Sequence, residues 1–292
     1  GVMIDDGDYI YEYITSSVGS LSTQINAISS IYLKPGLFLA NPLWQRVQSD
    51  ISFNATDQTD IRPSLGSYLF LPQYSFNSAD TIYGRRSYLQ KLLLDLYQGR
   101  IIALLSLELN RDLDRRYQET ERTRQDITAL QFDFKDFMAI NTRLELSHEL
   151  GEESRYDSQT HIYTALSSFE KNFNPATTAQ LELSFSREEN QKQSDAEENF
   201  ELNSISIAPS LRSVLMQKYR VSARIMGGYN YRKGSDFLSY LPQKRKGFIA
   251  DAQLLGIYRL NAFSSFSLEY RFGKYPSDKA SHNLKLEFKA EL

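Results

Sequence analysis

Strict alternation of apolar and polar residues recurs along most of this chain, from about residue 89 to the end. In 101–109 the odd-numbered residues are Ile, Ala, Leu, Leu and Leu, and 181–185 and 266–272 repeat the pattern. Successive side chains of a β-strand point to opposite faces, so a period of two predicts strands with one apolar and one polar face. Repeated this often, the pattern predicts a large sheet whose apolar face must be kept from water.

Composition narrows what can cover that face. The chain has 292 residues and 13% aromatics, and its mean hydropathy is −0.45. It contains no apolar run near 18 residues, so a transmembrane helix is excluded. A membrane β-barrel is not excluded, because half of each strand faces a polar lumen and lowers the mean hydropathy. The sequence therefore predicts lipid around the apolar face.

Charge and cysteine content exclude several classes of function. The net charge of −3 gives no basic field for nucleic acid, so no nucleic-acid partner is expected. The absence of cysteine excludes disulfides, cysteine-ligated zinc, iron–sulfur clusters and thiol catalysis. No phosphate-loop or dinucleotide fingerprint is present, and no cofactor is expected. The opening GVMIDDGDYIYEY lacks the features of a signal peptide, which favours a processed mature chain or the C-terminal part of a longer one.

Twelve strands are predicted in the C-terminal part of the chain. Their spans are 43–56, 87–98, 101–117, 124–137, 140–151, 158–172, 177–188, 198–210, 217–232, 247–260, 263–273 and 282–292. Segments 21–34 and 66–76 are two further candidates. The first also shows a helical spacing of apolar residues, although its β-branched and serine content favours a strand. The expected fold is all-β, an antiparallel transmembrane β-barrel of twelve to fourteen strands, with fourteen preferred.

The connectors between these strands alternate in length. Short ones (98–100, 137–139, 172–176 and 260–262) take turns with long charged ones (111–124, 151–158, 187–198, 232–247 and 273–282). Alternation places all short turns at one end of the sheet, as in outer-membrane barrels with short periplasmic turns and long external loops. The expected organisation is a transmembrane barrel over 41–292, with 1–40 as an N-terminal extension, first strand or lumen plug.

With these strands and connectors, residues 43–292 resemble a bacterial outer-membrane β-barrel protein. The last segment alternates to Leu292, similar to the C-terminal signal that such proteins present to their insertion machinery. The N-terminal DDGDYIYEY is similar to Gly-Asp-Tyr runs of uncharacterised outer-membrane proteins of the Bacteroidetes–Chlorobi kind. The resemblance implies a location in the bacterial outer membrane. The implied partners are the lipid bilayer, lipopolysaccharide and the barrel-insertion machinery.

The polar face is expected to line a lumen. Its predicted ionisable lining residues are Lys91, Asp95, Glu108, Arg143, Glu145, Glu182, Arg220, Arg224, Asp251, Glu269, Arg271, Lys285 and Glu287. Such a lining predicts a channel or transport protein for small polar solutes, and the mixture of signs predicts no strong preference for anions or cations. The alternative is a closed or plugged barrel with a structural or interaction role. It would anchor a protein partner or surface complex through residues 1–40 or the long loops.

Aromatic residues near strand ends are expected at the membrane interface. The selected anchors are Trp44, Tyr97, Phe137, Tyr219 and Tyr258. Their amphipathic rings suit the level of the lipid headgroups, where membrane proteins concentrate such residues.

Catalysis and metal binding have little support in the sequence. His148 and His161 flank the 151–158 loop and should lie roughly opposite each other, but no third ligand has a convincing spacing, so no metal is expected. A hydrolase at the barrel rim would need Ser147 and Asp157 to meet these histidines. No nucleophile-elbow motif is present, so the chain is not expected to be an enzyme.

Overall fold

A computed structural model gives the fold. It describes residues 11–15, 21–37, 42, 44–59, 81–116, 120–137, 139–155, 157–192, 199–216, 218–234, 241–261 and 263–290. The strands are β1 (Tyr11–Thr15), β2 (Leu21–Leu33), β3 (Val47–Thr59), β4 (Thr81–Tyr97), β5 (Ile101–Asp114), β6 (Glu121–Phe137), β7 (Ile140–Glu153), β8 (Ser158–Asn174), β9 (Thr177–Lys192), β10 (Phe200–Leu215), β11 (Tyr219–Gly234), β12 (Gly247–Arg259), β13 (Ser264–Lys274) and β14 (Ser281–Ala290). Three short 3-10 helices accompany them: η1 (Pro35–Leu37), η2 (Trp44–Arg46) and η4 (Pro242–Lys244).

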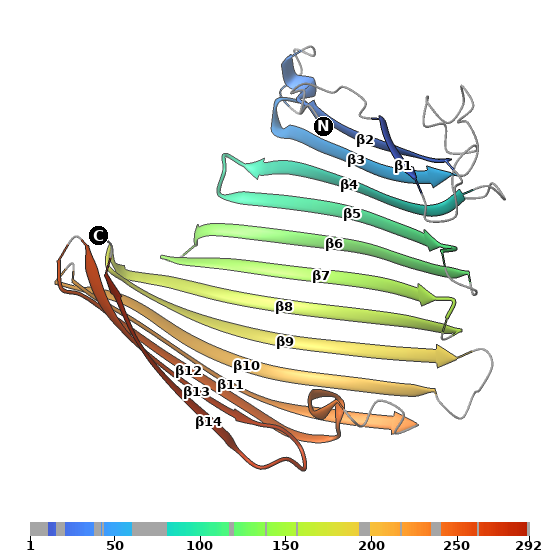
Figure 1. The fold of residues 1–292 in the computed structure, drawn as a ribbon. Coiled ribbons are helices and arrows are strands. Elements are labelled where there is room, and N and C mark those ends of the chain that lie inside the picture. Colours follow the sequence, from blue (N-terminus) through green and yellow to red (C-terminus); the bar gives the residue numbers. More distant parts are fainter. Residues whose placement is uncertain are drawn as a thin grey trace.

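All described strands belong to one antiparallel sheet of fourteen strands, in which each strand pairs with the next along the chain (Figure 1). The all-β, antiparallel prediction is confirmed, and the described strands number fourteen. Residues 21–33 are strand rather than helix and pair with β3. The fourteenth strand is β1, whereas 66–76 lies outside the described residues. The predicted strand at 43–56 begins later than expected, because Trp44–Arg46 form η2.

The connectors are segregated by length, as predicted. The turns after β4, β6, β8, β10 and β12 lie at one end of the sheet, here called the short-connector end, at the left of Figure 1. Gln98 and Gly99 form one of them, with φ of 43° and 73°, and the Arg100 amide donates to the Tyr97 carbonyl at 2.7 Å. The long connectors lie at the other end. One exception is the β2–β3 connector, which lies at the short-connector end and holds η1 and η2.

The strand register assigns every residue to one of two faces, because directly paired residues point the same way. One row across β5 to β12 reads Leu105, Leu130, Leu146, Ala165, Phe185, Ile205, Tyr229 and Phe248. The adjacent row reads Ser106, Ala129, Ser147, Thr164, Ser186, Ser204, Asn230 and Gly247. We call these the apolar face and the polar face.

The apolar face is open in the isolated chain. Leu146 is 59% exposed and Ile205 is 62% exposed. Exposure of an apolar face of this size to water would be very unfavourable, so the face requires an apolar environment. Among the described residues, no helix has the length and hydropathy needed to cross a membrane.

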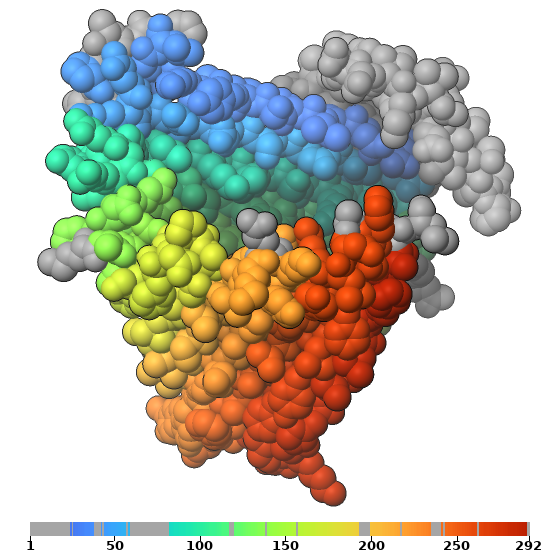
Figure 2. Space-filling model, turned by 90° about the vertical axis from the view of Figure 1, so that its left-hand side faces the viewer, coloured from blue at the N-terminus to red at the C-terminus, as the bar shows by residue number. Residues whose placement is uncertain are grey.

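The sheet twists and curls along its width. In Figure 1, β12 to β14 cross the direction of the earlier strands at a steep angle. Figure 2 faces the short-connector end and shows the strands passing from blue through green and yellow to orange and red around the molecule. The β1–β14 pairing that would close the sheet is not among the described pairs, so closure stays a prediction.

Candidate functional site

The thirteen predicted lining residues all lie on the polar face. Their positions follow from the register of the sheet, for example Lys91 beside Asp50, Glu182 beside Ala208, and Glu269 beside Lys285. The period-two pattern therefore assigned these residues to one face consistently over eight strands. That this face lines a lumen remains a prediction, and its charges are the candidate functional site.

Several of these residues are brought together as ion pairs. Arg224 Nη2 lies 2.9 Å from Glu182 Oε2, so this pair reaches over β10. Arg271 Nε is 2.5 Å from Glu269 Oε1, and Lys285 Nζ is 3.4 Å from Glu287 Oε2. These three contacts hold lining side chains in fixed positions, although exposed pairs of this kind stabilise a fold only modestly.

The other lining residues have different surroundings. Arg143 Nε contacts Asp133 Oδ1 at 2.8 Å. Asp133 was not among the predicted lining residues, although its position in the alternation of the predicted strand 124–137 places it on the same face. Asp95 accepts the Gly99 amide at 2.7 and 2.8 Å, so its carboxylate fixes a turn. Among the described residues, six lining groups have no ion-pair partner: Lys91, Asp95, Glu108, Glu145, Arg220 and Asp251.

Charge on the polar face is segregated across β5 to β12, whereas β4, β13 and β14 each carry both signs. In the described part of β5 to β9, leaving aside the β6 bulge, the acidic residues are Glu108, Asp112, Asp114, Glu121, Asp133, Glu145, Glu149, Glu153, Glu170, Glu182 and Glu188, and the basic ones are Arg143 and Lys192. In β10 to β12 the basic residues are Arg212, Arg220, Arg224, Arg232 and Arg259, and the acidic one is Asp251. The sequence pattern missed this division, because it appears only when neighbouring strands are considered together.

A long connector folds onto the polar face beside β9 to β11. Asn230, which is 1% exposed, donates from Nδ2 to the Gln243 carbonyl at 2.5 Å and to the Arg245 carbonyl at 3.2 Å. Lys244 Nζ lies 2.5 Å from Glu188 Oε1, and the Arg232 guanidinium lies 4.7 Å from the Phe200 ring centre. We call residues 241–246 the folded-in loop.

The folded-in loop is part of the long charged connector predicted at 232–247, and it packs against the strands. Arg245 Nη1 also pairs with Asp278 Oδ1 at 2.7 Å, so the loop contacts the β13–β14 connector as well. Phe200, beneath the loop, is only 4% exposed. These contacts fix the loop against the strands at the long-connector end.

All five predicted interface aromatics lie at the short-connector end. Tyr97 ends β4, Phe137 ends β6 and Trp44 lies in η2 before β3. The Tyr219 and Tyr258 rings stack with centroids 4.5 Å apart. The structure thus gathers them at one level of the sheet, and their role at a membrane interface remains a prediction.

The two histidines meet, but on the apolar face. His148 Nε2 lies 3.2 Å from His161 Nδ1, and the His148 ring stacks on Tyr163 at 4.6 Å. Ser147 belongs to the polar face, so it points away from both histidines and the rim-hydrolase arrangement does not form. No group of three or more metal-ligating side chains occurs within the described ranges.

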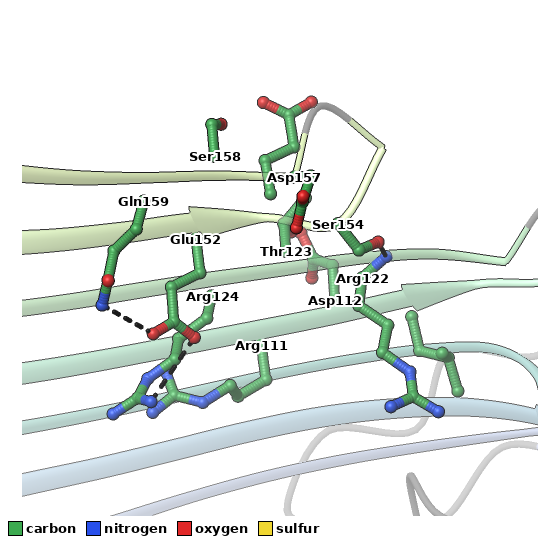
Figure 3. Close-up of a pocket in the computed structure, with 12 residues that line it drawn as sticks. Arg111, Asp112, Arg122, Thr123, Arg124, Glu152, Ser154, Asp157, Ser158 and Gln159 are labelled. Atoms are coloured by element: carbon green, nitrogen blue, oxygen red, sulfur yellow. Dashed lines mark hydrogen bonds and ion pairs between the residues drawn. The ribbon is translucent and has the colours of Figure 1, made fainter. Parts of the chain in front are cut away.

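A cavity of about 380 Å³ opens at the long-connector end of β5 to β8 (Figure 3). Glu152 is central to its polar lining, because it accepts Gln159 Nε2 at 3.1 Å and faces Arg124 Nη1 at 3.5 Å. Figure 3 shows Arg111, Arg124, Glu152 and Gln159 extending to the same side of the strands. We call this the arginine cleft.

Comparison with known proteins gives similarity in fold alone. No protein-family model matches the sequence, and no curated protein matches it. The chain is similar to the FrpB iron transporter of Neisseria meningitidis in its F5-1 variant apoprotein form, with a TM-score of 0.64 and 13% identity over 93% of this chain and 50% of that one. The F3-3 variant gives a TM-score of 0.59 and 12% identity over 87% and 44% of the two chains. The fold is therefore that of outer-membrane β-barrels, and the chain spans about half the length of the transporter chain that it matches.

Proposed function

We propose that this chain forms the wall of an outer-membrane β-barrel that transports polar solutes. The observation that carries the proposal is the separation of the two faces, since lipophilic rows such as Leu105–Leu130–Leu146 alternate with rows of serine, threonine and charge. A wall with lipid on one side and water on the other needs this division in every strand. The similarity in fold to an iron transporter supports the proposal without identifying the solute.

The charge distribution refines the proposed solute class. Strands β5 to β9 present acidic groups and β10 to β12 present arginines. In a lumen, this arrangement would set up a field across the passage, drawing cationic groups to one part of the wall and anionic groups to the other. We therefore propose small polar solutes that carry charge, with an orientation set by the wall.

The folded-in loop would occupy part of that passage. It is fixed on the polar face by Asn230, which makes two hydrogen bonds from a buried position. Loss of a buried hydrogen bond leaves groups unsatisfied and costs about 1–3 kcal/mol. This is enough to raise the population of a released loop by about fivefold to 150-fold.

Asn230→Ala is accordingly expected to increase single-channel conductance of the purified full chain in a planar bilayer, or to produce flickering between two levels. Asn110→Ala is the matched control, because Asn110 lies on the polar face of β5 and donates to Glu108 at 2.8 Å, away from the loop. The control should conduct like the unaltered chain.

Absence of conductance from every form, together with absence of solute uptake into liposomes, would contradict the transport proposal. The anchoring role would then be favoured if the chain purified in a stable complex that is lost on deletion of residues 1–40. Equal conductance of the Asn230 variant and the unaltered chain would agree with transport, but it would contradict the proposal that the folded-in loop occupies part of the passage.

A further inference from the structure

Another cavity, of about 520 Å³, opens at the short-connector end of β9 to β12. Five of the residues that line it lie on the polar face according to the strand register: Arg212, Val214, Arg220, Leu255 and Ile257. The volume of the cavity is within the range of binding sites for small molecules. We call it the short-end cavity.

Two arginines supply the charge of the short-end cavity. Arg212 of β10 lies opposite Ser222, and Arg220 precedes Ser222 by two residues on β11, so the two arginines are diagonal neighbours. Diagonal neighbours on adjacent strands are about 7–8 Å apart, a distance that long side chains can span. The two guanidinium groups can therefore contact the same small anion.

No negative charge in the described part of the chain compensates these arginines. None of the described residues that line the cavity is acidic. Arg212 and Arg220 are exposed, and neither side chain has an ion-pair or hydrogen-bond partner among the described residues. Glu182 and Glu269, on nearby strands of the same face, already pair with other arginines, at 2.9 and 2.5 Å. The arginine cleft differs in this respect, because its lining holds carboxylates as well as arginines.

Apolar side chains lie beside the two arginines. Leu255 and Ile257 are two residues apart on β12, and Ile257 is directly opposite Arg220. Val214 is directly opposite Arg220 on its other side, on β10. These three residues depart from the alternation expected of a strand that faces water. An apolar surface next to uncompensated cations is suited to a solute that joins an apolar part to an anionic group.

We infer that the short-end cavity binds small organic anions that join a carboxylate to an apolar group. The carboxylate would contact the guanidinium groups of Arg212 and Arg220, and the apolar group would lie against Leu255 and Ile257. A singly charged carboxylate is favoured over a phosphate, because a second negative charge is costly to place beside an apolar surface. The inference rests on the proposed function, which places the polar face along a passage for charged solutes, and it names the solute class for the basic part of that face.

The test titrates 4-phenylbutyrate into the purified full chain in neutral detergent by calorimetry, with detergent alone as the blank. Arg212→Gln and Arg220→Gln should each weaken the Kd by about tenfold, the loss expected for one charge-assisted contact. Lys91→Gln is the matched control, because it removes one positive charge from the polar face of β4, outside the cavity. Its Kd should equal that of the unaltered chain.

The three substitutions are expected to retain the fold. Within the described residues, none of the side chains of Lys91, Arg212 and Arg220 takes part in an ion pair. The gel shift between heated and unheated samples checks each variant before the titration.

Two further ligands separate the charged part of the site from the apolar part. 4-Phenylbutanamide keeps the apolar group and removes the charge, whereas acetate keeps the charge and removes most of the apolar group. Both should bind the unaltered chain at least about tenfold more weakly than 4-phenylbutyrate, since each loses one of the two kinds of contact.

Equal Kd values for the arginine variants and the unaltered chain, or for the acid and its amide, would overturn the inference. Acetate that binds as tightly as 4-phenylbutyrate would identify a site for simple anions and would also overturn it. Conductance in a planar bilayer without binding of 4-phenylbutyrate would agree with transport and overturn this inference alone. Binding that depends on the arginines, in a chain that shows no conductance, would support the cavity as a binding site and contradict the transport proposal.

Discussion

Leu146→Arg is expected to weaken folding of the chain into a bilayer by about 2–4 kcal/mol, the cost of a cation at the lipid-facing midplane of a barrel. Leu146 lies in β7 on the apolar face, and its side chain contacts little of the protein, being 59% exposed. The cost therefore comes from placing charge in lipid, with little contribution from lost packing. A shift of this size changes the folding equilibrium by about thirtyfold to a thousandfold.

The neighbouring residue is the matched control. Ser147 is on the polar face, between Ala129 and Thr164 of the adjacent strands. Ser147→Arg adds the same side chain one position along the same strand, where Glu145 and Glu149 supply negative charge. Its free energy of unfolding should change by less than about 1 kcal/mol.

Reversible urea unfolding in phospholipid vesicles measures both changes, and the gel shift between heated and unheated samples gives a second readout. Equal destabilisation by Leu146→Arg and Ser147→Arg would show that the two faces do not meet different solvents. Greater destabilisation by Ser147→Arg would reverse the assignment of the faces.

Gly228→Val is expected to destabilise the sheet by about 1–3 kcal/mol through overpacking. A Cβ at Gly228 would lie 2.8 Å from the Ile205 carbonyl oxygen and 3.1 Å from Ser206 Cβ. The first of these is a backbone atom of β10, so the strand itself must move to relieve the contact. Glycine at this position allows β10 and β11 to approach closely next to the folded-in loop.

Gly256→Val provides the control for this prediction. A Cβ at Gly256 meets nothing within 4 Å, and the residue lies in a strand of the same sheet. Valine has a higher strand propensity than glycine, so this variant should be neutral or slightly more stable. The comparison of their unfolding midpoints in vesicles tests the close approach, and equal midpoints would contradict it.

The strands were predictable because their signal is local. Each of the spans predicted from 101–117 to 282–292 overlaps one strand, and the predicted lining residues share one face because parity needs no knowledge of neighbouring strands. The ends of the strands were predicted less accurately, as at Trp44, where a 3-10 helix replaces the predicted start of a strand. The sequence of 21–34 was compatible with both a strand and a helix. The structure shows a strand, because this segment pairs with β3.

The candidate sites were less predictable because they depend on register. Arg212, Arg220 and Leu255 belong to three strands and line one cavity only when β10, β11 and β12 are aligned. The segregation of acidic and basic residues on the polar face has the same origin. In the sequence, Asn230 cannot be distinguished from other residues of the polar face. Its role is visible only in the structure, where its side chain donates hydrogen bonds to the carbonyls of residues 243 and 245.

The most direct test of the account places spin labels along β7. The chain has no cysteine, so single cysteines at 143 to 148 can be labelled without background. In reconstituted vesicles, collision with oxygen should be high at Leu144 and Leu146, whereas collision with a water-soluble nickel chelate should be high at Arg143, Glu145 and Ser147. The account predicts a period of two with opposite phase for the two reagents. High accessibility of every position to the nickel chelate, or the same phase for both reagents, would contradict the claim that one face of this sheet meets lipid and the other meets water.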